Sequence, residues 1–494
     1  MILKRVNPID VGVNPNAILN IVNTLDKCNC HSLMILRHDK VICEGWWKPY
    51  KKDYNHVLFS LSKSFVATAI CFAVQEGLLS FDDFVVNFFK DQFPYRPCEN
   101  MEKVQIKHLL MMGYGHNVNQ EPDWYLRENW LDENLKIYLE EEPGTKFHYD
   151  NRCPFLCSVI LQRVTGLTVL DYLKPRLFEP LGIEGAWWES KNGINIGRGG
   201  LNLKTEDIGK FGLFLLHKGK INGKQLLKEE FIDQMTSFKL PTKGSGFTSK
   251  PVIDWLSGYG YFFWMCSQEG AFRADGACCQ FSVVMPKQDI VVAITAGTSS
   301  AGQIILQSLW DNLTQNLDLN IENQNQNESQ NEGEFEDKQN VLMSRLNSLH
   351  IPYPPGNYDF SYLSNYSGNV YLICENKMNI TKLSIDFNDK FDTIRLWIKE
   401  EMIEVKAGHG EWIETDTKFH PEDFIAHTTF FFSNVGCSSA FDNNEYIIKF
   451  AFTRTPYCDT LKLKFDDKVI LGEYICNPVM QHRGNRFQIM GSKI

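Results

Sequence analysis

The sequence lacks three features that would assign it to common classes of protein. It has no long run of basic residues, and its 60 acidic and 50 basic residues give a net charge of −10, which argues against nucleic acid as a partner. No apolar segment follows Lys4 and Arg5, so we expect no signal peptide. The longest apolar stretch, residues 58–74, contains Lys63 and several hydroxyl groups, which predicts a core helix and no membrane span.

Patterns typical of metal sites are also missing. The chain has 14 cysteines, but the pairs Cys28/Cys30 and Cys278/Cys279 do not have Cys-x-x-Cys spacing, and no histidine cluster accompanies them. We therefore expect no metal site. Many cysteines without an export signal are typical of a reducing compartment in which thiols stay free, so the expected location is the cytoplasm.

The first 317 residues combine strand-like segments at both ends with helical segments between them. Glycine and proline divide the helical part, which covers residues 61–238. Strands are expected at residues 31–37, 40–46, 259–265, 271–276, 281–285 and 290–295, and a final helix at 301–317. This order predicts the α+β class, with an antiparallel sheet built from both ends of the segment and flanked by helices.

The composition changes sharply after this segment. Residues 318–340 are rich in Asn, Gln and Glu with almost no apolar residue, which predicts a solvated linker between domain 1–317 and domain 341–494. Alternating apolar segments after the linker predict an accessory all-β domain, a small barrel or sandwich. Its histidines are scattered and are interpreted as ordinary surface or core residues: His409, His420, His427 and His482.

A serine followed three residues later by a lysine opens the apolar helix. Ser60 and Lys63 are at positions i and i+3, so in a helix their side chains lie on one face and can meet. A lysine buried in an apolar helix loses hydration, which lowers its pKa and lets it act as a neutral base beside the hydroxyl. Because serine and lysine are common, a chance match is the alternative interpretation.

A second candidate element is the turn-rich segment 143–151, which leads into a helix. Tyr149 could serve as a proton carrier beside a lysine cation, and Asn151 could hydrogen-bond Lys63 and a substrate carbonyl. A purely structural interpretation is equally open, with Tyr149 as a packing aromatic residue and Asn151 as a helix N-cap.

The order of three motifs resembles the serine β-lactamase and penicillin-binding-protein superfamily, specifically its class C β-lactamase-like hydrolases and esterases. The motifs are S-x-x-K at Ser60, Y-x-N at Tyr149 and a strand that ends x-x-G at Gly276. Further similar segments are residues 44–47, 76–80, 106–110, 143–145, 178–183, 199–201 and 259–261. The resemblance implies a β-lactamase/transpeptidase-like fold.

The resemblance also implies a role for each matching residue of the first two motifs. Ser60 matches the acylated serine, and Lys63 matches the lysine that receives or relays its proton. Tyr149 matches the tyrosine that acts as general base and acid. Asn151 matches the residue that orients Lys63 and the substrate.

The third motif matches only in part. Gly276 matches the family's glycine, and the backbone N–H of Ala277 would form the oxyanion hole with that of Ser60. Ala274 stands where relatives carry a basic Lys or His. Its loss removes a charge-assisted contact to a substrate carboxylate worth roughly 1.5–3 kcal/mol, so efficient β-lactam hydrolysis is not expected.

Asp275 has two interpretations. A carboxylate beside the oxyanion strand could select substrates with an amino or other cationic group, but alternation along the strand favours an orientation away from the site. Cys278 and Cys279 are interpreted as buried thiols and His148 as a polar neighbour of Tyr149.

These expectations converge on a serine hydrolase that cleaves an ester or amide bond through an acyl-enzyme on Ser60, with no cofactor. The alternative is a catalytically weak ligand-binding or regulatory module, and a third interpretation is a true β-lactamase or D-amino-acid peptidase. The expected partner is a small-molecule ester, amide or peptide, with neither nucleic acid nor membrane. The sequence does not define the oligomeric state.

Overall fold

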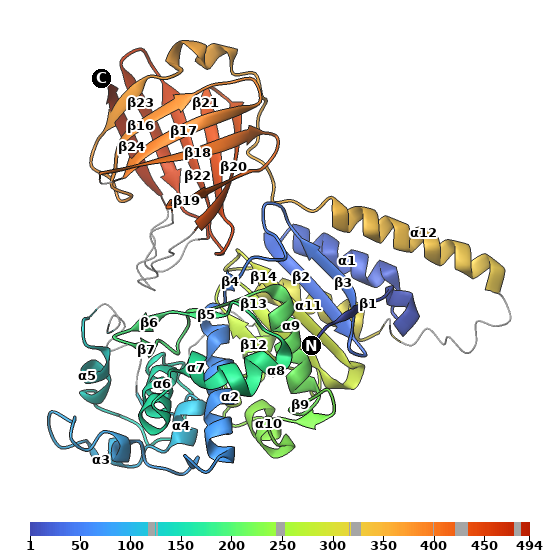
Figure 1. The fold of residues 1–494 in the computed structure, drawn as a ribbon, viewed down its shortest axis with the longest axis vertical. Coiled ribbons are helices and arrows are strands. Elements are labelled where there is room, and N and C mark those ends of the chain that lie inside the picture. Colours follow the sequence, from blue (N-terminus) through green and yellow to red (C-terminus); the bar gives the residue numbers. More distant parts are fainter. Residues whose placement is uncertain are drawn as a thin grey trace.

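The computed structural model describes residues 1–494 except 117–123, 125–126, 244–251, 316, 318–327, 399, 420–432 and 479–485, and it gives only the backbone of 328–335 and 433. His420, His427, His482 and the first part of the predicted linker lie outside the described residues. The described chain folds into a helix-covered sheet and a β-barrel (Figure 1).

The sheet has seven strands in the order β1-β3-β2-β14-β13-β12-β11. Their bounds are β1 Lys4–Arg5, β2 Cys30–Arg37, β3 Lys40–Trp46, β11 Trp264–Met265, β12 Phe272–Gly276, β13 Gln280–Met285 and β14 Ile290–Ala296. All neighbours are antiparallel except β1 and β3. The two ends of the segment meet where β2 pairs with β14, for example Ile35 with Val292. The prediction of an antiparallel sheet flanked by helices is confirmed.

Helices cover both faces of this sheet. Helices α1 (Pro15–Asp26) and α11 (Gly302–Leu313) pack on one face through aliphatic side chains such as Ile18 and Leu309. Helices α2 (Ser62–Gln75) and α9 (Thr205–Leu216) belong to the core on the other face.

Helix α2 is buried along nearly its whole length, because every residue of 62–73 is buried. It ends where Gly77 adopts a left-handed conformation with φ of 72°, which glycine accepts without steric cost. The remaining helices of eight or more residues in this part of the chain are α6 (Arg152–Thr165) and α10 (Glu229–Thr236).

Within the described residues, no single helix has the length and apolar composition needed to cross a membrane. Helix α6 and the helical segment Val169–Leu181 meet both criteria only when they are taken together. The chain bends by 66° between them.

The linker prediction did not include a helix, but α12 (Glu328–Asn347) begins inside the predicted linker and extends beyond it. Apolar residues at the end of this helix explain its position: Leu342 is buried in the core that contains α1, and Leu346 packs against the same core. Arg345 Nη2 also lies 2.7 Å from Asp26 Oδ2.

The C-terminal strands form a closed barrel, which decides between the two predicted all-β architectures. The strands are β15 Val370–Ile373, β16 Ile380–Asp386, β17 Phe391–Ile398, β18 Glu401–His409, β19 Ile413–Thr417, β20 Ser433–Asp442, β21 Glu445–Phe452, β22 Cys458–Phe465, β23 Val469–Ile475 and β24 Arg486–Lys493. A short parallel pairing of β18 with β20, Gly408 with Ser438 and His409 with Ser439, completes the ring. His409 Nε2 lies 3.2 Å from the buried Asp392 Oδ1.

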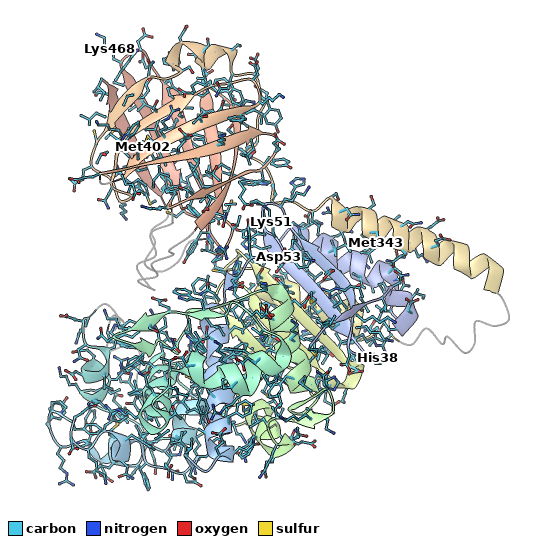
Figure 2. The ribbon with its side chains drawn as sticks, viewed as in Figure 1. His38, Lys51, Asp53, Met343, Met402 and Lys468 are labelled. Carbon is cyan, nitrogen blue, oxygen red and sulfur yellow. The ribbon has the colours of Figure 1, made fainter. Side chains whose placement is uncertain are left out.

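The barrel contacts the sheet unit next to the segment that precedes Ser60. Val57 N donates to Arg454 O at 3.0 Å, and Phe59 packs against the hydrophobic core of the barrel. Figure 2 shows Lys51 where the two units meet, and its Nζ lies 2.7 Å from Glu414 Oε2.

Candidate active site

Ser60 lies in η2 (Phe59–Leu61), a short 3-10 turn that continues into α2. Phe59 has φ of 46°, in the left-handed region that bulky residues rarely adopt. The backbone therefore turns sharply just before Ser60, and the Ser60 side chain borders a cavity at the start of the helix.

Two neighbouring serines anchor the start of α2 and leave Ser60 as the one that borders the cavity. Ser62 Oγ accepts a hydrogen bond from Leu201 N at 3.1 Å, and Ser64 Oγ donates to Phe262 O at 2.7 Å. Both hydroxyls are buried. Their contacts hold the helix end against strand β8 (Leu201–Leu203) and the segment that carries Phe262.

Lys63 is buried directly behind Ser60, as the i, i+3 spacing predicts. Its Nζ donates to Ser60 Oγ at 2.7 Å and to the backbone carbonyl of Arg198 at 2.7 Å. Burial lowers the pKa of Lys63 well below its usual value, and the positive charge of Arg198 lowers it further. Lys63 can therefore lose its proton at a much lower pH than an exposed lysine.

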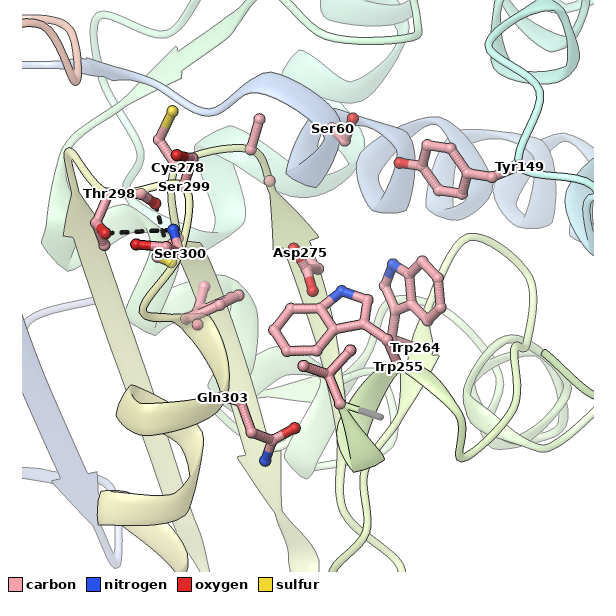
Figure 3. A pocket seen from close by; sticks show the side chains of 16 residues that line it. Ser60, Tyr149, Trp255, Trp264, Asp275, Cys278, Thr298, Ser299, Ser300 and Gln303 are labelled. Carbon is pink, nitrogen blue, oxygen red and sulfur yellow. Dashed lines mark hydrogen bonds between the residues drawn. The ribbon is translucent and has the colours of Figure 1, made fainter. Parts of the chain in front are cut away.

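Tyr149 completes a group of three side chains. Its hydroxyl points toward Ser60 in Figure 3, the Ser60 side chain acts on its pKa, and Lys63 Nζ lies 5.0 Å from its ring centroid. The ring stacks on Trp264 with centroids 5.8 Å apart and meets Tyr259 edge-on at 6.3 Å. Burial raises the pKa of Tyr149, so the phenol keeps its proton at neutral pH.

Among the described residues, the hydrogen bonds of Lys63 go to Ser60 and Arg198, which corrects the predicted hydrogen bond from Asn151. Asn151 occupies the N-cap position of α6, but its side chain makes no capping hydrogen bond, and within the described residues it makes none to Lys63. The carbonyl of Arg198 instead accepts the second hydrogen bond of Lys63. A backbone group supplied by another loop could not be recognised from the Y-x-N motif.

The third motif lies on β12, which passes very close to the segment before Ser60. A Cβ atom on Gly276 would lie 2.1 Å from the carbonyl oxygen of Leu58, so only glycine fits here. Ala277 follows at the exposed hairpin turn, and no turn or loop hydrogen bond of the described residues uses the amide of Ser60 or Ala277. Ala274 is buried in the core beside α2 and brings no charge to the cavity.

Asp275 faces the cavity, which corrects the orientation that strand alternation favoured. Its Oδ2 accepts from Arg273 Nε at 2.9 Å. Burial raises the pKa of Asp275 to about 6, although Arg273 and Lys63 oppose this shift. The chain therefore supplies its own cation for this carboxylate, which weakens the prediction that Asp275 selects cationic substrates.

Arg273 is fully buried between two indole rings. Its Cζ lies 4.4 Å from the ring centroid of Trp255 and 5.8 Å from that of Trp264, and Nη1 donates to Asp254 O at 2.9 Å. The Arg273–Asp275 pair thereby fixes the aromatic wall of the cavity.

The cavity has a volume of about 430 Å³. One wall is apolar and the opposite end carries hydroxyl and amide groups (Figure 3). The apolar side chains are Val252, Trp255, Trp264 and Phe281, and the polar ones are Thr298, Ser299, Ser300 and Gln303.

The two adjacent cysteines form the turn between β12 and β13 and border the cavity. Both have left-handed backbones, with φ of 62° at Cys278 and 68° at Cys279. Gln280 holds the turn because its Nε2 donates to Ala277 O at 3.1 Å and to Ala296 O at 2.8 Å. Burial raises the pKa of Cys279 well above its usual value, so its thiol stays protonated.

His148 is engaged away from the nucleophile. Its Nε2 lies 2.8 Å from Glu141 Oε2. Within the described residues, no three His, Cys, Asp or Glu side chains come together in an arrangement suited to a metal ion.

Arg198 and Arg273 are the site residues that the sequence analysis missed. Arg198 directly precedes the Gly-Gly-Leu segment 199–201, which was recognised only as a point of resemblance. Arg273 lies two residues before Asp275, so both point to the same face of the strand. The Arg-x-Asp spacing in a predicted strand therefore indicates that the two side chains can form an ion pair on one face.

The comparisons with known proteins agree with this architecture. The family model for beta-lactamase matches residues 20–303. The chain belongs to the beta-lactamase family. Its fold is the β-lactamase/transpeptidase-like fold, and proteins of this fold include esterases and other hydrolases.

Individual relatives of this beta-lactamase family member are distant. An uncharacterized protein of Alkalihalophilus pseudofirmus is 23% identical over 257 residues, which cover 46% of this chain and 70% of the relative. Penicillin-binding protein 4* of Bacillus subtilis is 28% identical over 154 residues, 28% of this chain and only 31% of that protein. The solved structure of EstCE1, described as a hydrolase with promiscuous acyltransferase activity, has a TM-score of 0.50 and 15% identity, and the match covers 60% of this chain and 99% of EstCE1. At that identity the likeness shows the fold.

Proposed function

We propose that this protein is a serine hydrolase that cleaves an ester or amide bond of a small molecule through an acyl-enzyme on Ser60. The observation that carries the proposal is the contact of Ser60 with both Lys63 and Tyr149 at the edge of a 430 Å³ cavity. A nucleophile that is hydrogen-bonded to a base and faced by an acid can perform acyl transfer without a metal or organic cofactor.

In this proposal the two proton carriers have different tasks, which the directions of their pKa shifts support. Lys63, whose pKa burial lowers, takes the proton of Ser60 Oγ as Oγ bonds to the substrate carbonyl carbon. Tyr149, whose pKa burial raises, is a phenol that gives its proton to the leaving group as the bond to the carbonyl carbon breaks. The Lys63 ammonium then returns a proton to Tyr149.

Deacylation reverses these roles. Water loses a proton to the unprotonated member of the pair and attacks the ester carbonyl, and Ser60 Oγ leaves with a proton. In both steps negative charge develops on the carbonyl oxygen, and the amides of Ser60 and Ala277 would stabilise it. The Ser60 amide lies at the N-terminal end of α2, where the helix dipole favours negative charge.

Labelling with a fluorophosphonate probe tests the nucleophile. We expect one label, assigned to Ser60 by peptide mass spectrometry, and no label in Ser60→Ala. Ser62→Ala is the matched control and should still be labelled, because Ser62 Oγ contacts Leu201 N and does not border the cavity. Labelling that persists in Ser60→Ala would contradict the proposal.

The buried, uncharged Ala274 favours a second candidate, a catalytically weak ligand-binding module. Incubation with p-nitrophenyl esters, short D-amino-acid amides and β-lactams separates the two candidates. A hydrolase releases product from at least one ester or amide through Ser60, whereas a binding module turns over none of them. We expect ester turnover and little β-lactam hydrolysis.

A further inference from the structure

The cavity at Ser60 is the first of three that follow one another toward the barrel. Thr298, Ser299 and Ser300 also border a second cavity of about 600 Å³. The second cavity in turn shares Lys27, Asn29 and Asn477 with a third, of about 690 Å³. Because each cavity shares lining residues with the next, the three lie side by side, and we call the series that begins at Ser60 the groove.

Both units of the molecule line the far end of this groove. Lys27 and Asn29 directly follow α1, whereas Lys449 and Asn477 belong to the barrel. Direct contacts hold the two units together here: Cys458 of the barrel, which also borders the far cavity, packs in the hydrophobic core that contains α1, and the Tyr50 hydroxyl donates to Thr455 O at 3.3 Å. The groove is therefore a built feature of the contact between sheet and barrel.

Two lysines, Lys27 and Lys449, border the far end of the groove, and the buried Asp459 behind it accepts from Asn477 N at 3.0 Å and from the Tyr474 hydroxyl at 2.9 Å. The one acidic residue that lines this end, Asp26, is neutralised by Arg345 at 2.7 Å. Arg486, which also lines this end, pairs with Glu473 at 3.1 Å. Lys449 binds only carbonyl oxygens, and Lys27 makes no ion pair within the described residues.

We propose that the groove holds the distal part of an extended substrate that carries a carboxylate remote from the scissile bond. The scissile carbonyl lies at Ser60, polar groups in the middle of the substrate hydrogen-bond the hydroxyls of Thr298, Ser299 and Ser300, and the carboxylate lies near Lys27 and Lys449. This assignment rests on the proposed hydrolase function and names its substrate class, a linear ester or amide with an anionic end.

Ligand binding to the full-length Ser60→Ala variant tests the groove without requiring turnover. The probes are half p-nitroanilides of linear dicarboxylic acids of increasing length, each compared with its methyl ester by calorimetry. The carboxylate should not affect the short ligand, which cannot reach the lysines. It should strengthen binding of the long ligand about three- to fivefold, the strength of a solvent-accessible ion pair, and less at high salt.

Removing the lysine charges tests where the ligand carboxylate binds. Lys27→Gln and Lys449→Gln, each added to Ser60→Ala, should reduce the gain from the carboxylate, and together they should abolish it. Lys52→Gln is the control, because Lys52 is exposed and does not border the groove. Equal binding of acid and methyl ester at every length, or a gain that persists without both lysines, would overturn the inference.

Hydrolysis separates the two proposals. The corresponding p-nitrophenyl half-esters, given to the unmodified protein, should be cleaved with the same length-dependent preference for the acid. If the carboxylate strengthens binding but no ester or amide is hydrolysed, the groove stands and the hydrolase proposal fails. If short neutral esters are hydrolysed through Ser60 without any carboxylate effect, the hydrolase proposal stands and the groove proposal fails.

Discussion

At the scale of single residues, the proposed mechanism depends on how the protein lowers the pKa of Lys63. Desolvation is the largest cause, and the charge of Arg198 is the next. Arg198 also presents its backbone carbonyl to Lys63, while its side-chain Cζ lies 5.3 Å from the ring centroid of Trp130. One residue therefore positions the Lys63 side chain through its backbone and lowers the pKa of Lys63 through its side chain.

Replacing Arg198 separates these two contributions. Arg198→Met keeps the carbonyl but removes the positive charge, so the pKa of Lys63 should rise. Because the proposed mechanism uses the unprotonated lysine, the acidic limb of the kcat/KM profile should move to higher pH. Arg198→Lys should restore the original limb. A limb that stays in place in Arg198→Met would show that Arg198 does not tune Lys63.

At the scale of elements, the approach of β12 to the segment before Ser60 brings two parts of the chain together to form the site. A methyl group at Gly276 would lie 2.1 Å from Leu58 O, so Gly276→Ala must push β12 away. The amide of Ala277 then moves relative to Ser60, and we expect kcat to fall about a hundredfold.

A second glycine provides the control for Gly276→Ala. Gly270 precedes β12 and has φ of 77°, but an added methyl group there meets no atom within 4 Å. Gly270→Ala should lower the melting temperature through backbone strain and leave kcat unchanged. If both variants lose stability to the same extent and both keep full activity, the close approach of β12 does not serve catalysis.

The sequence predicted those elements that depend on local patterns. The apolar run of α2 and the alternation of β12 to β14 indicated their type and order, and the i, i+3 spacing brought Lys63 to Ser60. Contacts between distant segments could not be predicted in this way. The second partner of Lys63 is 135 residues away, and the orientation of Asp275 depends on where β12 lies in the sheet. The barrel closes through the pairing of β18 with β20. These strands are about 30 residues apart, so a local sequence pattern does not predict their pairing.

At the scale of the whole molecule, the barrel supports the segment that leads to Ser60. His56 and Val57 form β4, and Val57 N donates to Arg454 O. Beside this contact His31 Nδ1 lies 3.2 Å from His56 Nε2, and the ring of His31 stacks on Tyr50 at 3.7 Å. Because both histidines are buried and in contact, protonation of either one is unfavourable in the folded protein.

This junction should make stability depend on pH. Burial lowers the pKa of His56 to about 4 and that of His31 well below its usual value. Between about pH 6.5 and pH 4 the unfolded chain then binds more protons than the folded one, so stability is present above this window and is lost as the pH falls through it. His56 alone would contribute a loss of up to about 3 kcal/mol.

Urea unfolding at a series of pH values measures this loss. His56→Gln should flatten the decline below pH 6.5, because the substituted side chain binds no proton, even if the variant is less stable at neutral pH. His38→Gln is the control, since His38 is exposed at the β2–β3 turn and lies far along the chain from the barrel contact. Equal slopes for His56→Gln and the unmodified protein would show that the junction is not the site of acid sensitivity.

Because the same segment leads directly into Ser60, we also expect ester turnover to fall in the same pH window, and less steeply in His56→Gln.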